Sequence, residues 1–404
     1  MKNKNLEIIN NFHQEIVKNN IKKKFFRNFS VLMSNLRVDL NSYNKTLNVL
    51  NKKFTFDRKV KQLKKFKNYK IIAVIGMGGS ILGAEAIYNF FQKKIKKKFY
   101  FFDDVNETKI LEFKKKEKLS NVLFIIISKS GNTIETLANT FSLNIIKKNS
   151  KNIILISEKN NNYLYNLSKK LNIFFIEHKS FVGGRYSVLS ETGIIPAYFM
   201  GINTTRLRSN LLEFLNDKNR LFLKNSLSYI TNIFNSKKYN SLILLNYSPE
   251  LEKFLFWCQQ LIAESLGKNN KGFLPVISNA PKDHHSLLQL YLDGPKDKIF
   301  YIFSVAEKFR VKTKFTKSLK KNYLDKKSLS TIKNAQRESL KSVLLKKKIP
   351  FREFKIKKID ENSLGQLFSY FILETVSVGN LSKINPYDQP AVEEVKVNTK
   401  KLLT

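Results

Sequence analysis

The chain has 404 residues, 42% of them hydrophobic, with 14 Gly and 8 Pro, and this composition excludes a disordered or collagen-like protein. Its length predicts two to three domains, because single hydrophobic cores stop growing at about 250–300 residues. The formal net charge is +41, but only ten of the 73 basic residues are arginine, so we interpret the excess as a lysine-rich background and expect no nucleic-acid partner.

Residues 1–66 are predicted to form an N-terminal helical segment. Apolar residues recur there at helical spacing, as in Leu6, Ile9 and Phe12, and the stretch from residue 6 to residue 65 contains neither Gly nor Pro. A periodic apolar face without helix breakers is typical of helices that pack on a core.

A different pattern extends over residues 67–202, where short β-branched or aromatic runs alternate with helix-length connections. The runs lie at residues 71–75, 99–102, 121–127, 152–156 and 172–176. Strands that are apolar throughout predict a parallel sheet buried on both faces, and hence a doubly wound α/β domain.

The pattern restarts after a polar helical linker at residues 203–237. The second α/β domain, residues 238–360, is expected to contain strands at 240–246, 299–305 and 351–356, a helix at 249–267 and a lysine-rich helical stretch at 310–348. A C-terminal helical arm, 361–404, is expected to include an apolar helix at 364–379. Ligands of open α/β sheets bind beyond the carboxyl ends of the strands, so the loops there are the candidate sites.

The sequence also indicates where the protein works. Its single cysteine, Cys258, excludes an intrachain disulfide and a cysteine-rich metal site, which suits a reducing compartment. The first 20 residues have no signal-peptide core, and no stretch approaches the roughly 18 apolar residues of a membrane span. We therefore expect a cytoplasmic protein without a membrane partner.

A glycine-rich loop, Gly76-Met77-Gly78-Gly79-Ser80, follows the first predicted strand and leads into a helix. Backbone amides without an obstructing Cβ, next to a helix N-terminus, can bind an anionic group, but such a loop is equally typical of a tight structural turn. Ile81 stands where a dinucleotide fingerprint requires glycine. Asp103, at the end of the second strand, keeps a nicotinamide cofactor as a weak alternative.

The loop after the third predicted strand is dense in polar groups. It reads SKSGNTIET at residues 128–136 and enters a helix, so four hydroxyls, one lysine and helix-terminal amides lie together, whereas a helix cap needs only one of them. Because the strand is expected beside the first one, both loops could bind one phosphate. Glu135 is also open to interpretation as a first-turn carboxylate that complements the helix dipole.

Further clusters of functional side chains lie later in the chain. Arg185 follows paired glycines in VGGRYS, and an arginine in a lysine-rich chain indicates a need for planar, permanent charge. Glu264 lies near the end of a largely apolar helix, where the simplest interpretation is an exposed pair with Lys268 four residues later. His284 and His285 precede an apolar helix with Asp283 as its expected N-cap, and no ligand set for a metal is evident around them.

Taken together, these segments resemble the phosphoglucose isomerase family. The motifs that carry the resemblance, from residue 76 to residue 396, are GMGGSILG (76–83), SKSGNTIET (128–136), VGGRYSVLS (182–190), ESLGKNNKG (264–272), HSLLQLYLDG (285–294) and NPYDQPAVEEVK (385–396). The resemblance implies two sugar-isomerase (SIS)-type three-layer α/β/α domains with parallel sheets. It also implies a homodimer that interconverts glucose 6-phosphate and fructose 6-phosphate without a cofactor or metal.

The resemblance assigns a role to each matching residue. It implies that Glu264 moves a proton between carbons 1 and 2 through an enediol-type intermediate and that Arg185 stabilises the negative charge that develops. It implies that His285, polarised by Glu135 and supplied by the neighbouring subunit, opens the sugar ring, with Lys396 serving the ring oxygen. The residues that it assigns to substrate binding are Ser128, Lys129, Ser130 and Thr133 for the phosphate, Gly79 and Ser80 near the sugar, and Gln389.

The chain departs from the family pattern in places. It is short for the family, and Ala391 and Val395 stand where glycines are common, which leaves the backbone around Lys396 in question. His284 stays open as the active histidine, because only the register of the motif selects His285. The main alternative function is a non-catalytic SIS-domain regulator that binds phosphosugars, although such a protein could dispense with Glu264, His285 and Lys396, and all three are present.

Overall fold

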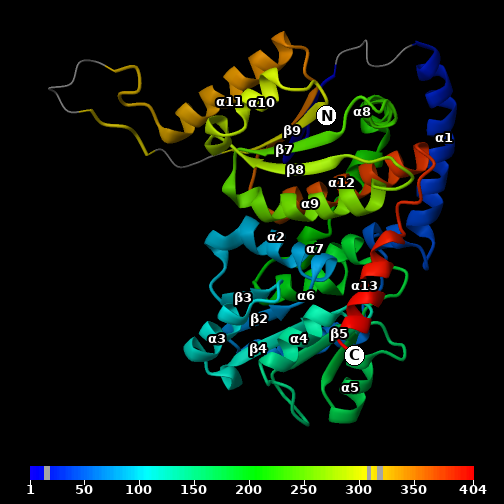
Figure 1. The fold of residues 1–404 in the computed structure, drawn as a ribbon, viewed down its shortest axis with the longest axis vertical. Coiled ribbons are helices and arrows are strands. Elements are labelled where there is room, and N and C mark those ends of the chain that lie inside the picture. The colour runs from blue at the N-terminus through cyan, green and yellow to red at the C-terminus, as the bar shows by residue number, and fades with distance from the viewer. Residues whose placement is uncertain (13–18, 307–310, 316–321) are drawn as a thin grey trace.

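The structure is a computed structural model, and it describes residues 1–12, 19–306, 311–315 and 322–404 (Figure 1). Its strands are β1 (Leu6–Asn11), β2 (Ile71–Ile75), β3 (Lys98–Phe102), β4 (Val122–Ile127), β5 (Ile153–Ser157), β6 (Phe174–Glu177), β7 (Ser241–Asn246), β8 (Leu274–Asn279), β9 (Lys298–Val305) and β10 (Phe351–Ile356). Its α-helices are α1 (Asn19–Asn41), α2 (Leu82–Phe91), α3 (Glu107–Lys116), α4 (Ile134–Ser142), α5 (Tyr163–Leu171), α6 (Glu191–Phe199), α7 (Thr204–Leu207), α8 (Asp217–Asn235), α9 (Glu252–Leu266), α10 (Leu288–Asp293), α11 (Leu329–Lys346), α12 (Glu361–Leu381) and α13 (Ala391–Leu402).

The first sheet is fully parallel, with the strand order β3-β2-β4-β5-β6. All six residues of β4 are buried, as expected for a central strand covered by helices on both faces. The chain enters the sheet at β2, crosses to one side with β3 and then returns to the other side with β4. The carboxyl ends of β2 and β4 therefore border the point where the strand order reverses, which is where doubly wound sheets bind ligands. The predicted strands of this domain are confirmed.

The second sheet has the order β1-β10-β9-β7-β8, and only β1 runs antiparallel to its neighbour. The helix predicted around Leu6 and Ile9 is wrong: residues 6–11 form β1, with Leu6 and Ile8 buried and Leu6 paired with Ile356. The burial of side chains in this segment alternates with a period of two, as in a strand, and does not follow the three-residue spacing of a helix. The strand forms because the edge of β10 offers backbone hydrogen-bond partners to it. β8 was not predicted.

Helices α9 and α12 lie beneath the second sheet, and α2 of the first domain packs against α9 (Figure 1). Residues 363–379 of α12 are all buried, which confirms the apolar helix predicted there. The helical prediction for 310–348 is confirmed at α11 only: residues 311–315, 322–328 and 347–348 are not helical, and residues 310 and 316–321 lie outside the described residues. In the part of the chain that the structure describes, no helix is both long enough and apolar enough to cross a bilayer.

A buried ion pair ties the second sheet to the helices below it. Arg352 on β10 is fully buried and pairs with Glu374 on α12. The guanidinium also donates to the hydroxyl of Tyr370 at 2.7 Å and to that of Tyr301 at 3.1 Å, and its Nε donates to Asn10 on β1 at 2.7 Å. Although burial opposes the charge, Glu374 and the two tyrosines raise the pKa of Arg352. The side chain of Arg352 thus links β10 to β1, β9 and α12.

Candidate active site

Two loops meet at the reversal point of the first sheet, and glycine allows their close approach. A Cβ on Gly79 would lie 2.2 Å from the carbonyl carbon of Gly184, so only glycine fits between the loop after β2 and the loop that carries Arg185. This contact places Ser80 and Arg185 on one cleft of about 280 Å³. The volume is close to the lower end of small-molecule sites, about 300 Å³.

The loop between β4 and α4 forms one wall of the cleft. Lys129, Ser130 and Thr133 line it, while Ser128 lies behind them, buried, with its Oγ 2.8 Å from Oγ1 of Thr133. Gly131 adopts a φ of 66°, a left-handed conformation that turns the loop back toward the helix. The ammonium of Lys129 lies 3.6 Å from the carboxylate of Glu158, which follows β5. This wall therefore presents hydroxyls, a cation and the N-terminus of α4.

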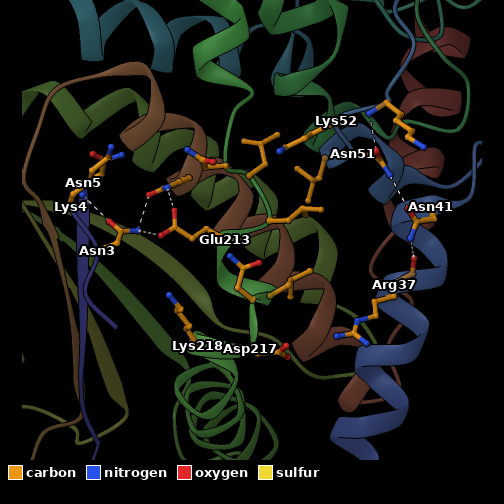
Figure 2. A pocket seen from close by; sticks show the side chains of 18 residues that line it. Asn3, Lys4, Asn5, Arg37, Asn41, Asn51, Lys52, Glu213, Asp217 and Lys218 are labelled. Atoms are coloured by element: carbon orange, nitrogen blue, oxygen red, sulfur yellow. Dashed lines mark hydrogen bonds between the residues drawn. The ribbon is translucent and has the colours of Figure 1, made fainter.

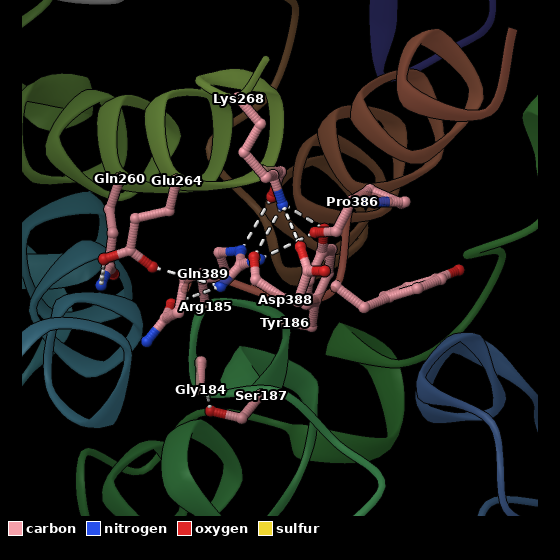
Figure 3. A network of polar contacts seen from close by, with 12 residues as sticks. Gly184, Arg185, Tyr186, Ser187, Gln260, Glu264, Lys268, Pro386, Asp388 and Gln389 are labelled. Carbon is pink, nitrogen blue, oxygen red and sulfur yellow. Dashed lines mark hydrogen bonds and ion pairs between the residues drawn. The ribbon is translucent and has the colours of Figure 1, made fainter. Parts of the chain in front are cut away.

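Arg185 is the centre of a polar network on the facing wall (Figure 3). Its side chain is 3% exposed, and its Nε donates to the hydroxyl of Ser265 at 2.8 Å. One terminal nitrogen contacts Glu264 at 3.3 Å and Gln389 at 2.6 Å, and the other donates to the carbonyls of Pro386 and Asp388 at 2.8 and 2.9 Å. A guanidinium held by this many partners is fixed in orientation, as a group that stabilises developing charge must be.

Glu264 projects from α9 into the cleft with its side chain 30% exposed. Gln260, one turn earlier on the same helix face, donates to Glu264 Oε1 at 3.0 Å, while Arg185 contacts the other carboxylate oxygen (Figure 3). Both oxygens are thus oriented by donors, and one edge of the group stays open to the cleft. Sequence reasoning missed Gln260, and its position four residues before Glu264 was the available signal.

The predicted pair between Glu264 and Lys268 is wrong. Lys268 lies beyond the end of α9, and its ammonium contacts the carboxylate of Asp388 and the carbonyl of Asp388, each at 2.7 Å. Its side chain is 13% exposed, and its hydrogen bond is the main cause that lowers the pKa of Asp388. Lys268 and Arg185 therefore both hold the loop 385–390, which leads into the C-terminal helix α13.

Helix α13 carries Lys396 to the edge of the cleft. Lys396 lines the cleft and pairs with Glu393 at 2.6 Å, with its own side chain 57% exposed. The helix runs along the front of the first domain toward α5 (Figure 1). Ala391 and Val395 both lie in regular helix and are exposed, so neither residue prevents Lys396 from reaching the cleft.

Replacing Lys268 by methionine is expected to lower kcat/KM for a reaction in this cleft about tenfold, mainly through a higher KM, because the loop that positions Gln389 and Lys396 loses charged hydrogen bonds. Steady-state kinetics measure this effect. Lys268→Arg keeps the charge and should retain more of the activity. Lys400→Met, which removes an exposed lysine of α13, is the matched control and should behave as wild type. A Lys268→Met enzyme with unchanged KM and kcat would contradict the positioning role.

The other predicted residues lie outside this cleft. Glu135 is half-buried in the first turn of α4, and His285 is exposed in the turn before α10. His284 is half-buried, and its Nε2 lies 2.8 Å from the hydroxyl of Tyr247, while burial and then the neighbouring His285 lower the pKa of its imidazole. The N-cap predicted for Asp283 is wrong, because its carboxylate accepts hydrogen bonds from the preceding Ser278 and from the backbone of Asn279.

The structure gives little support to the nicotinamide cofactor that Asp103 kept as an alternative. Asp103 pairs with Lys109 at 3.0 Å and does not line the cleft. Within the described ranges, no group of three His, Cys, Asp or Glu side chains is placed to hold a metal ion. What the cleft does combine is a cationic, hydroxyl-lined wall and a carboxylate beside a guanidinium. Such a site can bind an anionic substrate and transfer a proton next to a carbonyl.

A larger hollow, of about 1230 Å³, is lined by residues none of which lines the cleft (Figure 2). Its lining mixes lysines, asparagines and carboxylates. Glu213, one of these carboxylates, accepts hydrogen bonds from Asn3 and Gln366. Cations outnumber carboxylates in this hollow in about the same ratio as in the whole chain, so its charge does not point to a ligand.

Comparison with known proteins places these observations in a family context. A family model described as phosphoglucose isomerase matches residues 33–404. The glucose-6-phosphate isomerase of Methanocaldococcus jannaschii is 34% identical to the chain over 349 residues, which cover 84% of this chain and 86% of that protein. The glucose-6-phosphate isomerase of Campylobacter jejuni is 32% identical over 358 residues, covering 83% of this chain and 85% of that protein.

Solved structures show the same fold. A hypothetical protein from Thermus thermophilus superposes with a TM-score of 0.83 at 21% identity, covering 98% of this chain and all of that one. A glucose-6-phosphate isomerase from Chlamydia trachomatis superposes with a TM-score of 0.81 at 16% identity, covering 100% of this chain and 89% of that one. The α/β fold with largely parallel sheets that the sequence predicts is thereby confirmed.

Proposed function

The chain belongs to the phosphoglucose isomerase family and is an aldose–ketose isomerase that interconverts glucose 6-phosphate and fructose 6-phosphate; we propose that the cleft at the end of β2 and β4 is its active site. The observation that carries this assignment is the 3.3 Å contact between Glu264 and Arg185 in a cleft whose other wall holds Lys129. A base, a fixed cation and an anion-binding wall face one another there.

The phosphate is proposed to bind at the loop between β4 and α4. Lys129 supplies charge, the hydroxyls of Ser130 and Thr133 donate hydrogen bonds, and the N-terminus of α4 favours negative charge. Ser128 holds Thr133 from behind through the 2.8 Å contact between their hydroxyls. Gly79 and Ser80, on the loop after β2, then lie beside the sugar.

Glu264 is proposed to move the proton. The carboxylate takes a proton from carbon 2 of the open-chain aldose. The C–H electron pair forms the double bond between carbons 1 and 2, and the π pair of the carbon 1 carbonyl moves to its oxygen, which gives an enediol-type intermediate. The proton of the carbon 2 hydroxyl passes to the carbon 1 oxygen, the electron pair left on the carbon 2 oxygen forms the new carbonyl, and Glu264 returns its proton to carbon 1 to give the ketose. Negative charge develops on the substrate oxygens during this step. Arg185, fixed by Ser265, Gln389 and two carbonyls, stabilises that charge without having to reorganise.

Ring opening requires a second acid–base group, which we propose to be His285 of a neighbouring subunit, with Glu135 as its polarising carboxylate. His285 is exposed and lies outside the cleft of its own chain, which supports this arrangement. Lys396 would serve the ring oxygen from α13, and Gln389 would bind nearby. The protein is therefore proposed to work as a homodimer in which each cleft is completed by the partner chain.

Mixing two inactive variants tests both the reaction and the dimer. Wild type should convert fructose 6-phosphate to glucose 6-phosphate, whereas Glu264→Gln and His285→Asn should each lose most of this activity. Co-refolded together, they should recover about one quarter of wild-type activity, because half of the dimers contain one cleft with both native residues in a two-fold assembly. Coupled assays of glucose 6-phosphate formation measure the recovery.

The control uses two residues of the same cleft. Glu264→Gln mixed with Lys129→Ala should recover nothing, because no hybrid contains an intact cleft when both residues come from one chain. Absence of recovery with His285→Asn would contradict the shared site, and absence of wild-type turnover in a dimeric preparation would contradict the isomerase assignment. The sensor alternative is not favoured, since the proton-transfer group is present and oriented.

We also propose a cytoplasmic location. Cys258 is fully buried, and burial raises the pKa of its thiol well above the ordinary value, so it stays protonated and inert. A protein with one unreactive thiol needs no oxidising compartment. Its phosphorylated sugar substrates are charged and do not cross membranes unaided.

A further inference from the structure

A carboxylate stands in the proposed phosphate site. Glu158 follows β5, lines the cleft and has a side chain that is 16% exposed. One carboxylate oxygen lies 3.6 Å from the ammonium of Lys129, and the other accepts a hydrogen bond from Asn160 at 2.9 Å. The backbone reinforces this placement, because the Glu158 amide donates to the carbonyl of Lys129 at 3.0 Å.

The charges around Lys129 nearly cancel one another. His178, at the end of β6, is buried, and burial together with the charge of Lys129 lowers the pKa of its imidazole to about 4. It is therefore neutral at pH 7 and adds no positive charge to the site. Lys129 and Glu158 form an ion pair, so a phosphate dianion that approaches Lys129 meets a carboxylate already in contact with the same ammonium.

This inference rests on the assignment of the phosphate site given above. We propose that Glu158 is an affinity-lowering counter-ion, which pairs with Lys129 in the free enzyme and must be displaced by the incoming phosphate. Competition with a fixed carboxylate weakens the binding of any anion at this wall. An isolated phosphate ion makes no contacts beyond this wall, whereas the sugar of a sugar phosphate also contacts Arg185, Glu264 and the loop after β2. Glu158 thus limits how tightly this wall holds a phosphate group, while the sugar phosphate keeps enough other contacts to bind.

The test compares inorganic phosphate and fructose 6-phosphate on wild type and Glu158→Gln. Glutamine keeps an oxygen for Asn160 but removes the negative charge. The Ki of inorganic phosphate as a competitive inhibitor and the KM of fructose 6-phosphate should both fall about three- to tenfold, as expected for loss of one partly exposed repulsive charge. Glu158→Asp withdraws the carboxylate from Lys129, so its Ki and KM should lie between those of wild type and those of Glu158→Gln. Glu250→Gln removes the same charge from a pair with Lys93 outside the cleft and should leave both constants unchanged.

The possible outcomes separate this inference from the site assignment. If phosphate inhibits wild type competitively and its Ki in Glu158→Gln is higher or within about twofold of wild type, the counter-ion role is overturned. If Glu158 has only a structural role, Glu158→Gln should lower Tm without lowering the Ki of phosphate. That result would also overturn the counter-ion role. If phosphate does not compete in wild type and Lys129→Ala leaves the KM unchanged, the phosphate site itself is wrong.

Discussion

Replacing Glu264 by glutamine is expected to lower kcat for fructose 6-phosphate by about 10²- to 10⁴-fold while KM changes little. An amide cannot accept the proton that moves between the two carbons. Glutamine has the shape of glutamate and still offers a carbonyl oxygen to Arg185 or Gln260, so the cleft should keep its structure. The loss should therefore appear in the chemical step and not in substrate binding.

Proton exchange gives the most direct measurement. In deuterated water, wild type should exchange the proton on carbon 2 of glucose 6-phosphate, and Glu264→Gln should lose that exchange while still binding the substrate in a calorimetric titration. Glu252→Gln, at the first residue of the same helix and outside the cleft, is the matched control and should retain turnover. Exchange at the wild-type rate in Glu264→Gln would show that another group is the base.

The largest effect on stability is expected at Arg352. Arg352→Met should lower the free energy of unfolding by about 3–5 kcal/mol, because it leaves the buried carboxylate of Glu374 without its counter-charge. Methionine fills much of the same space, so the loss comes mainly from the unpaired charge. The tyrosine hydroxyls of Tyr301 and Tyr370 stay 2.9 Å from the carboxylate and offset only part of the cost.

Chemical denaturation measures the effect through the transition midpoint. Adding Glu374→Leu to Arg352→Met should recover a large part of the lost stability, since the stranded charge is then gone as well. Arg206→Met removes an exposed guanidinium that pairs with Asp360 and Glu361 at the surface, and it should cost less than about 1 kcal/mol. A loss of that small size in Arg352→Met would mean that the buried pair contributes no more than a surface one.

Sequence patterns located most of the fold because the strands of parallel sheets are continuously apolar. β4 and β9 are examples, each with almost every residue buried. β8 was not predicted because Pro275 interrupts its apolar pattern. Proline is tolerated there because β8 lies at a sheet edge. β1 was missed because its partner, β10, lies far along the chain, and an alternating pattern over only six residues is too short to outweigh the helical spacing of Leu6 and Ile9.

The site was predictable where one loop carries several functional groups, as at Lys129 and Thr133. It was less predictable where a contact joins distant segments. Lys268 has the spacing of a helical partner for Glu264, but the helix ends at Leu266 and the lysine turns to the returning loop at Asp388. No sequence motif marks Glu158. Its role depends on the pairing of β5 with β4, which places its carboxylate beside Lys129.

The antiparallel strand at the start of the chain also bears on the order in which the two sheets form during synthesis. All strands of the first sheet lie between residues 71 and 177, so that sheet can assemble soon after this stretch leaves the ribosome. β1 is made first but must wait for β10, because Leu6 pairs with Ile356 and Asn10 with Arg352. Until then β10 has not been made and the apolar residues of β1 have no sheet to join. The first sheet can therefore form before the second is complete, and β1 joins the second sheet only after β10 has been made.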